Sequence, residues 1–280
     1  MILKAAKHYL TNPKIEYRLL GGMSNYTYVV SENNQFYTIR VLGEYANHFV
    51  YREQEQYHIK RFEALNITSK TLYFDLETGI KVGQFIEGDI LSQVNPLDHL
   101  IEVSNILKQI HSAPKSKYDY HFFKRLEHYE SLNKNIPKSY YDLKAWAMDE
   151  YNQTYKYIKQ TFTHGDSQPS NFIVSKDKLY IVDFEFSGNN DPYYDIACFG
   201  NIEFDYALKL LDVYLGRKAN KEELKRLYYN RILQAIQWFL VAKFKHEAGM
   251  SETLKIPFDV FMEKYMNLAI KLKGEYDHTS

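Results

Sequence analysis

A stretch near the middle of the chain, Thr163 to Phe199, carries polar side chains that together could do metal-dependent chemistry. Asp166, Asn171 and Asp183 follow one another in that order. Two short apolar runs, 172–175 and 179–182, lie between Asn171 and Asp183 and are typical of a β-hairpin. Because a hairpin folds its two ends together, we expect the loop before it and the segment after it to lie side by side.

These residue types match the requirements of phosphoryl transfer. Such a site needs an acid that accepts the proton of the acceptor hydroxyl, together with oxygen ligands for Mg²⁺ beside the γ-phosphate. Asp166 has the chemistry of the base, Asn171 offers an amide oxygen and Asp183 offers a carboxylate. The structural alternative is a capped loop followed by an ordinary acidic turn, but it does not explain why the types, their order and the hairpin agree.

The region before residue 86 reads as a small β-rich lobe. A short helix is expected over 2–10, and a longer helix over 46–65. Alternating apolar runs with turn residues between them predict an antiparallel meander. Its expected strands are 15–20, 26–30, 36–42, 71–75 and 79–85.

The region after residue 86 reads as mainly helical. Apolar residues recur there at spacings of three and four, which is the pattern of amphipathic helices. The helices expected from this pattern are 91–110, 122–132, 140–159, 222–247 and 258–272. The glycine-containing segment Gly83 to Asp89 marks the boundary between the lobes, so the chain is predicted to be an α+β protein with lobes 1–86 and 87–280.

Composition excludes several classes of protein. Lysine plus arginine equals aspartate plus glutamate at 35 each, which removes the basic character of a general nucleic-acid binder. The segment from Asp183 to Val213 contains seven acidic residues and one basic residue, a local excess of negative charge that suits Mg²⁺ and a cationic substrate. No signal peptide and no membrane-spanning run is recognised, so a cytoplasmic location is expected.

The central stretch resembles a known superfamily. His164-Gly165-Asp166-x-x-Pro169-x-Asn171, followed by Ile181-Val182-Asp183-Phe184-Glu185, is similar to the Brenner motif and metal-binding segment of aminoglycoside phosphotransferases and choline kinases. The resemblance runs from about Leu19 to the last helix and is closest to bacterial choline kinases. It implies a protein-kinase-like two-lobe fold, with Asp166 as the catalytic base and with Asn171 and Asp183 binding the Mg²⁺ that bridges the phosphates of ATP.

The same resemblance implies a nucleotide site in the first lobe. Arg40 occupies the place of the phosphate-binding lysine of related kinases, and its planar fork suits phosphate oxygens. Its acidic partner is expected on the following helix, where Glu55 is favoured over Glu53. The remaining expected nucleotide contacts are Gly22, Ser24 and Asn25 in the glycine-containing loop, and Gln84, Phe85 and Ile86 near the adenine.

The acceptor is expected to be a small, cationic alcohol. The segment 185–197 is similar to that of bacterial choline kinases, and a quaternary ammonium needs a carboxylate and aromatic faces. The expected substrate residues are Glu185, Glu203, Tyr206 and Trp238. Choline kinases usually carry Asn where this chain has Gly165. They also usually carry a pair of aromatic residues on the helix where this chain has one Trp, Trp238. Aminoglycosides, thiamine and ethanolamine therefore remain as alternatives, and so does an inactive binding protein of the same fold.

Overall fold

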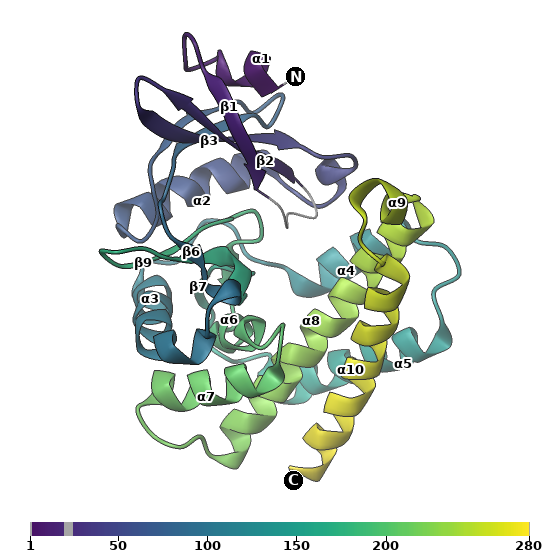
Figure 1. Cartoon of the computed structure of the whole chain (residues 1–280). Coiled ribbons are helices and arrows are strands. Elements are labelled where there is room, and N and C mark those ends of the chain that lie inside the picture. Colours follow the sequence, from purple (N-terminus) through teal and green to yellow (C-terminus); the bar gives the residue numbers. More distant parts are fainter. Residues whose placement is uncertain (1, 20–24, 280) are drawn as a thin grey trace. The chain divides into compact units, whose positions relative to one another are not determined.

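The computed structural model describes residues 2–19 and 25–279, and its contacts divide the chain into two compact units (Figure 1). The first unit contains residues 1–96 together with 169–187. The second unit contains residues 97–168 together with 188–280. The chain therefore leaves the second unit to form the hairpin and then returns to it.

The first unit is built on a five-stranded antiparallel sheet with the order β1-β2-β3-β5-β4. Its strands are β1 (Lys14–Leu19), β2 (Asn25–Glu32), β3 (Gln35–Leu42), β4 (Thr71–Phe74) and β5 (Lys81–Gln84). The strands expected from the sequence are all present, and the predicted α+β class with an antiparallel N-terminal sheet is confirmed.

The two faces of this sheet carry different chemistry because side chains alternate along β3. Ile39 and Val41 point to one face, where they form an apolar core with Ala5 and Ala6 at helix α1 (Ile2–Ala6). Arg40, between them, points to the opposite face and reaches helix α2 (Arg52–Ala64). One face is therefore a core, and the other presents a buried cation.

The hairpin predicted around the central motif is present. Strands β8 (Phe172–Val174) and β9 (Leu179–Ile181) pair antiparallel, and β6 (Asp89–Ile90) joins them as a third strand. Gly88, just before β6, allows close approach, because a Cβ atom there would lie 2.3 Å from the carbonyl oxygen of Val174. The hairpin thus belongs to the same unit as the five-stranded sheet.

The second unit is mainly helical, and α8 packs most extensively against α10. Its helices are α3 (Leu100–Ser112), α4 (Phe122–Ser131), α5 (Lys138–Glu150), α6 (Pro192–Phe199), α7 (Phe204–Leu215), α8 (Lys221–Glu247), α9 (Met250–Leu254) and α10 (Phe258–His278). A two-stranded sheet pairs β7 (Thr161–Thr163) with β10 (Gly188–Asn190). Within the described residues, no helix is long and apolar enough to cross a membrane.

Several boundaries differ from the prediction. The helix expected over 46–65 begins only at Arg52, after a 3₁₀ turn at Ala46–His48. The helix expected from 91 begins at Leu100, since Pro96 disfavours a helical conformation of the residue before it and 3₁₀ turns take its place. The helix expected to run to 159 ends at Glu150 and continues as a π-helical turn, Tyr151–Tyr155.

The short elements after the hairpin were not predicted. Helix α6 spans eight residues, too few for an apolar period to show. Its start is nevertheless well determined, because Asp191 caps it by accepting a hydrogen bond from the Tyr193 N–H, and Pro192 occupies its first position. This helix positions the buried Asp195, which contacts the loop of the candidate site.

Candidate active site

The candidate residues fall in both units. The nucleotide and metal residues Arg40, Glu55, Asn171 and Asp183 belong to the first unit. The expected base, Asp166, belongs to the second unit, five residues before Asn171 along the chain. Each part has its own internal geometry.

In the first unit, Arg40 and Glu55 form a buried, bidentate ion pair. The two terminal guanidinium nitrogens of Arg40 each donate to one carboxylate oxygen of Glu55, the second at 2.8 Å. Burial opposes ionisation of Glu55, but the positive charges of Arg40 and Lys81 outweigh it and lower the pKa of that carboxyl. The sequence-based choice of Glu55 over Glu53 thus corresponds to the pair that the structure forms.

Lys81 is a second cation at this place and was missed by the sequence reasoning. It lies opposite Arg40 in the β3–β5 register, so both side chains project from the same face. Its ammonium nitrogen is 3.6 Å from Oε1 of Glu55. Glu55 therefore has two cationic partners, and its negative charge is shared between Arg40 and Lys81. The Nε atom of Arg40 is buried without a hydrogen-bond partner among the described residues.

The ends of the hairpin meet as expected. The Val182 N–H donates to the carbonyl oxygen of Asn171 at 2.9 Å, which places Asp183 next to the Asn171 loop. Asp183 has a φ of 70°, a left-handed conformation that is uncommon for a residue other than glycine and recurs at functional sites. Phe184 then stacks on Phe62 of α2, with ring centroids 4.2 Å apart, and this contact fixes the chain just after Asp183.

Glu185, expected to contact substrate, is buried in the first unit. Its Oε2 accepts a hydrogen bond of 2.9 Å from Nδ2 of Asn25, which the sequence assigned to the nucleotide loop. Burial, followed by the negative charges of Asp183 and Glu55, raises the pKa of Glu185 well above its ordinary value. The side chain of Asn25 thus holds a carboxylate.

The other expected nucleotide contacts divide into two groups. Gly22 and Ser24 lie outside the described residues. Gln84 and Phe85 close β5, and their N–H groups donate to the carbonyl oxygens of Lys70 and Phe36. Ile86 is half-buried. With those two N–H groups occupied, an adenine at this place would use carbonyl groups or the backbone of Ile86.

The oxygen atoms of this unit fit a magnesium ion. Asn171 and Asp183 offer hard oxygen ligands, and Mg²⁺ in phosphoryl-transfer sites completes its shell with phosphate oxygens and water. Three carboxylates, Glu55, Asp183 and Glu185, here face two cations, and the negative charges of Asp183 and Glu55 add to burial in raising the pKa of Glu185. A divalent cation would relieve this excess of negative charge.

In the second unit, a fully buried carboxylate organises the loop that carries Asp166. The two oxygens of Asp195 accept hydrogen bonds from the N–H groups of His164 and Gly165, both at 2.8 Å. The His111 ring adds a third contact, with Nε2 3.1 Å from Oδ2 of Asp195. Asp166 in turn donates its N–H to Nδ1 of His164 at 3.2 Å. His164 therefore braces the loop.

We expect Asp195→Asn to destabilise the second unit. Burial opposes ionisation of Asp195, but the hydrogen bond and charge of His111 and the backbone donors lower its pKa. A carboxyl with a lowered folded-state pKa stabilises the fold above its unfolded-state pKa of about 4, and this contribution is lost as pH falls through the folded-state value.

At pH 7 the free energy of unfolding of the variant should therefore be about 3 kcal/mol lower than that of the wild type. As the pH falls, the free energy of unfolding should decrease less in the variant than in the wild type. Urea unfolding between pH 3 and pH 7 measures both effects. Asp149→Asn, on the exposed face of α5, is the matched control. If the stability of Asp195→Asn decreased with falling pH as much as that of the wild type, the ionised Asp195 would not stabilise the fold.

Gly165 departs from the family pattern without a structural penalty. Its φ is 83°, in the left-handed region that glycine adopts freely and that asparagine tolerates better than most residues. The position thus selects for backbone conformation, and Gly and Asn both satisfy it.

We expect Gly165→Asn to retain stability within about 1 kcal/mol, and Gly165→Val to lose about 1–3 kcal/mol. Chemical denaturation of the two variants measures the difference. Equal losses for Asn and Val would show that the space around the residue, rather than its φ, limits this position.

A chain of polar side chains supports Asp166 and was not found from the sequence. Nε2 of Gln168 donates to Asp166 at 3.1 Å, and Oε1 of Gln168 accepts from Asn201 at 2.7 Å. Asn201 accepts in turn from the buried Arg231 of α8 at 3.0 Å. These residues are far apart in sequence and share no motif spacing, so only the fold brings them together.

The expected substrate residues of the second unit are dispersed. Glu203 is exposed at the start of α7, while Tyr206 is half-buried, with its ring 6.5 Å from that of Phe199. Trp238 is half-buried on α8. The sequence missed Tyr265 of α10, whose pKa is raised first by burial and also by the charge of Asp166. An aromatic ring therefore lies in the surroundings of the expected base.

Comparisons with known proteins show the family to which the chain belongs. Residues 17–236 match the model of the choline/ethanolamine kinase family. Protein LicA of Haemophilus influenzae is 27% identical, over 96% of this chain and 83% of its own. The crystal structure of the choline kinase LicA from Streptococcus pneumoniae superposes with a TM-score of 0.81 at 25% identity, covering 98% of this chain and 97% of that one.

A further crystal structure, of LicA in complex with AMP, has a TM-score of 0.79 and 24% identity and covers 97% of each chain. It shares the fold in which the Arg40–Glu55 pair and the hairpin are placed. The expected family and the two-lobe kinase-like fold are thereby confirmed. This chain belongs to the choline/ethanolamine kinase family and is an ATP-dependent phosphotransferase whose acceptor is an alcohol group.

Proposed function

We propose that this protein is a choline kinase that transfers the γ-phosphoryl group of ATP to the hydroxyl group of choline. The proposal rests on family membership, on the order of Asp166, Asn171 and Asp183 in the chain, and on the similarity to LicA proteins. The observation that carries it furthest toward choline is the superposition of 98% of this chain on the choline kinase LicA from Streptococcus pneumoniae, and the half-buried Tyr265 of α10 offers an aromatic ring. Such a ring suits a quaternary ammonium, which cannot donate a hydrogen bond.

In the proposed reaction, Asp166 acts as the base. Its carboxylate accepts the proton of the choline hydroxyl while that oxygen forms a bond to the γ-phosphorus and the bond from the γ-phosphorus to the β–γ bridging oxygen breaks. The products are phosphocholine and ADP. Gln168 orients the carboxylate through its hydrogen bond to Oδ2, and the Asp195-bound backbone of His164 and Gly165 fixes the loop.

The first unit is proposed to hold the nucleotide. Arg40, kept in place by Glu55, would bind phosphate oxygens, and Asn171 and Asp183 would hold Mg²⁺. The ion, when bound, neutralises charge on the phosphates. Glu55 acts on the nucleotide through Arg40, so it is a positioning residue.

Ethanolamine is the second candidate acceptor, because the matching family model includes ethanolamine kinases. Steady-state kinetics with ATP, Mg²⁺ and, in turn, choline, ethanolamine, thiamine and kanamycin separates these possibilities. We expect kcat/KM for choline to exceed the others by about tenfold or more, the effect of about 1.4 kcal/mol. A higher value for another acceptor would reassign the substrate, and ATP binding without any transfer would favour an inactive binding protein.

Tyr265 provides a test of cation recognition. We expect Tyr265→Ala to raise KM for choline about tenfold, in line with a cation–π contribution of about 1–2 kcal/mol, and Tyr265→Phe to restore it because the ring is kept. Tyr141→Ala, which removes an exposed ring from α5, is the control. An equal rise in KM for Tyr265→Ala and Tyr265→Phe would show that the hydroxyl group, and not the ring face, matters.

A further inference from the structure

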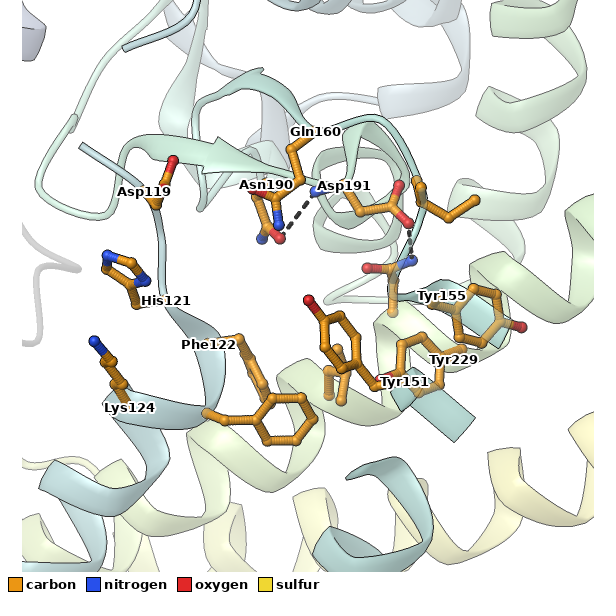
Figure 2. A pocket seen from close by; sticks show the side chains of 14 residues that line it. Asp119, His121, Phe122, Lys124, Tyr151, Tyr155, Gln160, Asn190, Asp191 and Tyr229 are labelled. Atoms are coloured by element: carbon orange, nitrogen blue, oxygen red, sulfur yellow. Dashed lines mark hydrogen bonds between the residues drawn. The ribbon is translucent and has the colours of Figure 1, made fainter. Parts of the chain in front are cut away.

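The second unit contains a pocket of about 350 Å³ that shares no residue with the candidate active site (Figure 2). It lies at the far end of the β7–β10 sheet. Thr161 pairs with Asn190 at the pocket, whereas Thr163 pairs with Gly188 where the chain continues into the Asp166 loop. Gln160, just before β7, also lines the pocket. Its volume lies in the range of small-molecule sites, about 300–1,000 Å³.

The walls of this pocket include two unusual backbone segments. Tyr151 and Tyr155 come from the π-helical turn that follows α5, and such turns occur frequently at functional sites. His121 caps α4 with a φ of 52°, a left-handed conformation that costs free energy in a residue other than glycine. Both segments therefore place their side chains through backbone conformations that regular helices avoid.

Three ionisable side chains lie along one side of the pocket. Figure 2 shows Asp119, His121 and Lys124 along that side, each from the segment that leads into α4 or from its first turn. In the part of the chain that the structure describes, the side chains of His121 and Lys124 form no ion pair or hydrogen bond. Among the described residues, Asp119 accepts only from the neutral amide of Asn189, at 2.7 Å. This side thus offers the carboxylate of Asp119, the ammonium group of Lys124 and the imidazole ring of His121, none of which has a charged partner among the described residues.

The remaining wall is aromatic and electrically neutral. Tyr151 extends into the middle of the pocket, and Tyr155 and Tyr229 lie on the side opposite His121, their rings stacked at 4.2 Å (Figure 2). Asp191 is the other carboxylate here, but Arg226 binds both its oxygens, at 2.6 and 2.8 Å. Its charge is therefore already compensated, and a ligand would meet ring faces on this wall.

We propose that this pocket binds a small zwitterion with an aromatic or apolar body. The ammonium group of the ligand would face Asp119, its anionic group would face Lys124 and His121, and its body would pack against Phe122 and Tyr151. Two sources share this chemistry, an aromatic α-amino acid and a phosphorylated amino alcohol. The site is separate from catalysis, so it stands whether or not choline is the acceptor.

Saturation-transfer NMR and calorimetry with L-phenylalanine and with phosphocholine test the proposal. We expect at least one of the two to bind. Tyr151→Ala should weaken this binding about tenfold, and Lys124→Met and Asp119→Asn about threefold to fivefold each, because exposed charge pairs contribute about 1 kcal/mol or less. The controls are Tyr157→Ala, an 85% exposed ring of the neighbouring turn, and Lys221→Met, an exposed lysine of α8.

Singly charged analogues sharpen the test. 3-Phenylpropionate lacks the ammonium group, so its binding should depend on Lys124 and not on Asp119, and the reverse is expected for 2-phenylethylamine. Phosphocholine that binds only as a reaction product would be weakened by Arg40→Gln and unaffected by Tyr151→Ala. That result, or the absence of binding of both zwitterions at 10 mM, about the weakest affinity of interest for a small ligand, would overturn the proposal.

Discussion

Replacing Asp166 with asparagine is expected to lower kcat by about 10³-fold, because the amide cannot accept the proton of the acceptor hydroxyl. The amide oxygen can still accept the hydrogen bond from Gln168, so the loop should keep its conformation. ATP affinity should stay within about threefold of the wild type, because the proposed base acts on the acceptor rather than on the nucleotide. Steady-state kinetics and calorimetric ATP binding measure the two quantities.

Asp149→Asn is a suitable control for this variant, because it removes an exposed carboxylate of α5 without touching the loop. Its kcat and its thermal stability should equal those of the wild type. An Asp166→Asn enzyme with wild-type turnover would remove Asp166 from the chemistry. A variant with equal losses in turnover and ATP binding would indicate a structural role instead.

Replacing Asp183 is expected to remove the magnesium dependence of nucleotide binding. Asparagine is the more informative substitution, because it tolerates the φ of 70° at this position while losing the negative charge. Affinity for ATP in the presence of Mg²⁺ should fall more than about 100-fold, exceeding the 10–100-fold typical of residues that only support a metal ligand. Affinity for ATP without Mg²⁺ should be unchanged or higher, since one carboxylate fewer repels the phosphates.

Alanine at position 183 adds backbone strain to the loss of charge, so Asp183→Ala should also lower stability by about 1 kcal/mol or more. Asp177→Asn, in the exposed turn of the same hairpin, is the matched control, because Tyr180 can still donate to an amide oxygen there. Calorimetric titration of ATP with and without Mg²⁺ decides the outcome. A normal Mg²⁺ dependence in Asp183→Asn would place the metal elsewhere.

Local sequence patterns predicted the elements that surround the site. The apolar run 36–42 predicted the strand that carries Arg40, and the two apolar runs after Asn171 predicted the hairpin that brings Val182 to the Asn171 carbonyl group. These patterns have short periods and extend over a few residues, so they can be recognised from the sequence without knowledge of the fold. The start of α3 was misjudged because apolar residues before Pro96 imitate a helical period that the proline interrupts.

Long-range contacts of the site could not be predicted in the same way. Lys81 joins Glu55 only because β5 pairs with β3 in one particular register. Asp195 contacts His111, which lies 84 residues away, and this contact has no signal in the sequence. Tyr265 reaches the surroundings of Asp166 through the packing of α10, whose apolar pattern predicts a helix but not its neighbours.

The central claim is that this chain moves a phosphoryl group from ATP to choline with Asp166 as the base, and ³¹P NMR of the reaction mixture tests it most directly. With ATP, Mg²⁺ and choline, we expect the phosphocholine resonance to grow in step with that of ADP for the wild-type protein and to be absent for Asp166→Asn over the same time. ADP formed without phosphocholine, or phosphocholine formed at the wild-type rate by Asp166→Asn, would contradict the claim.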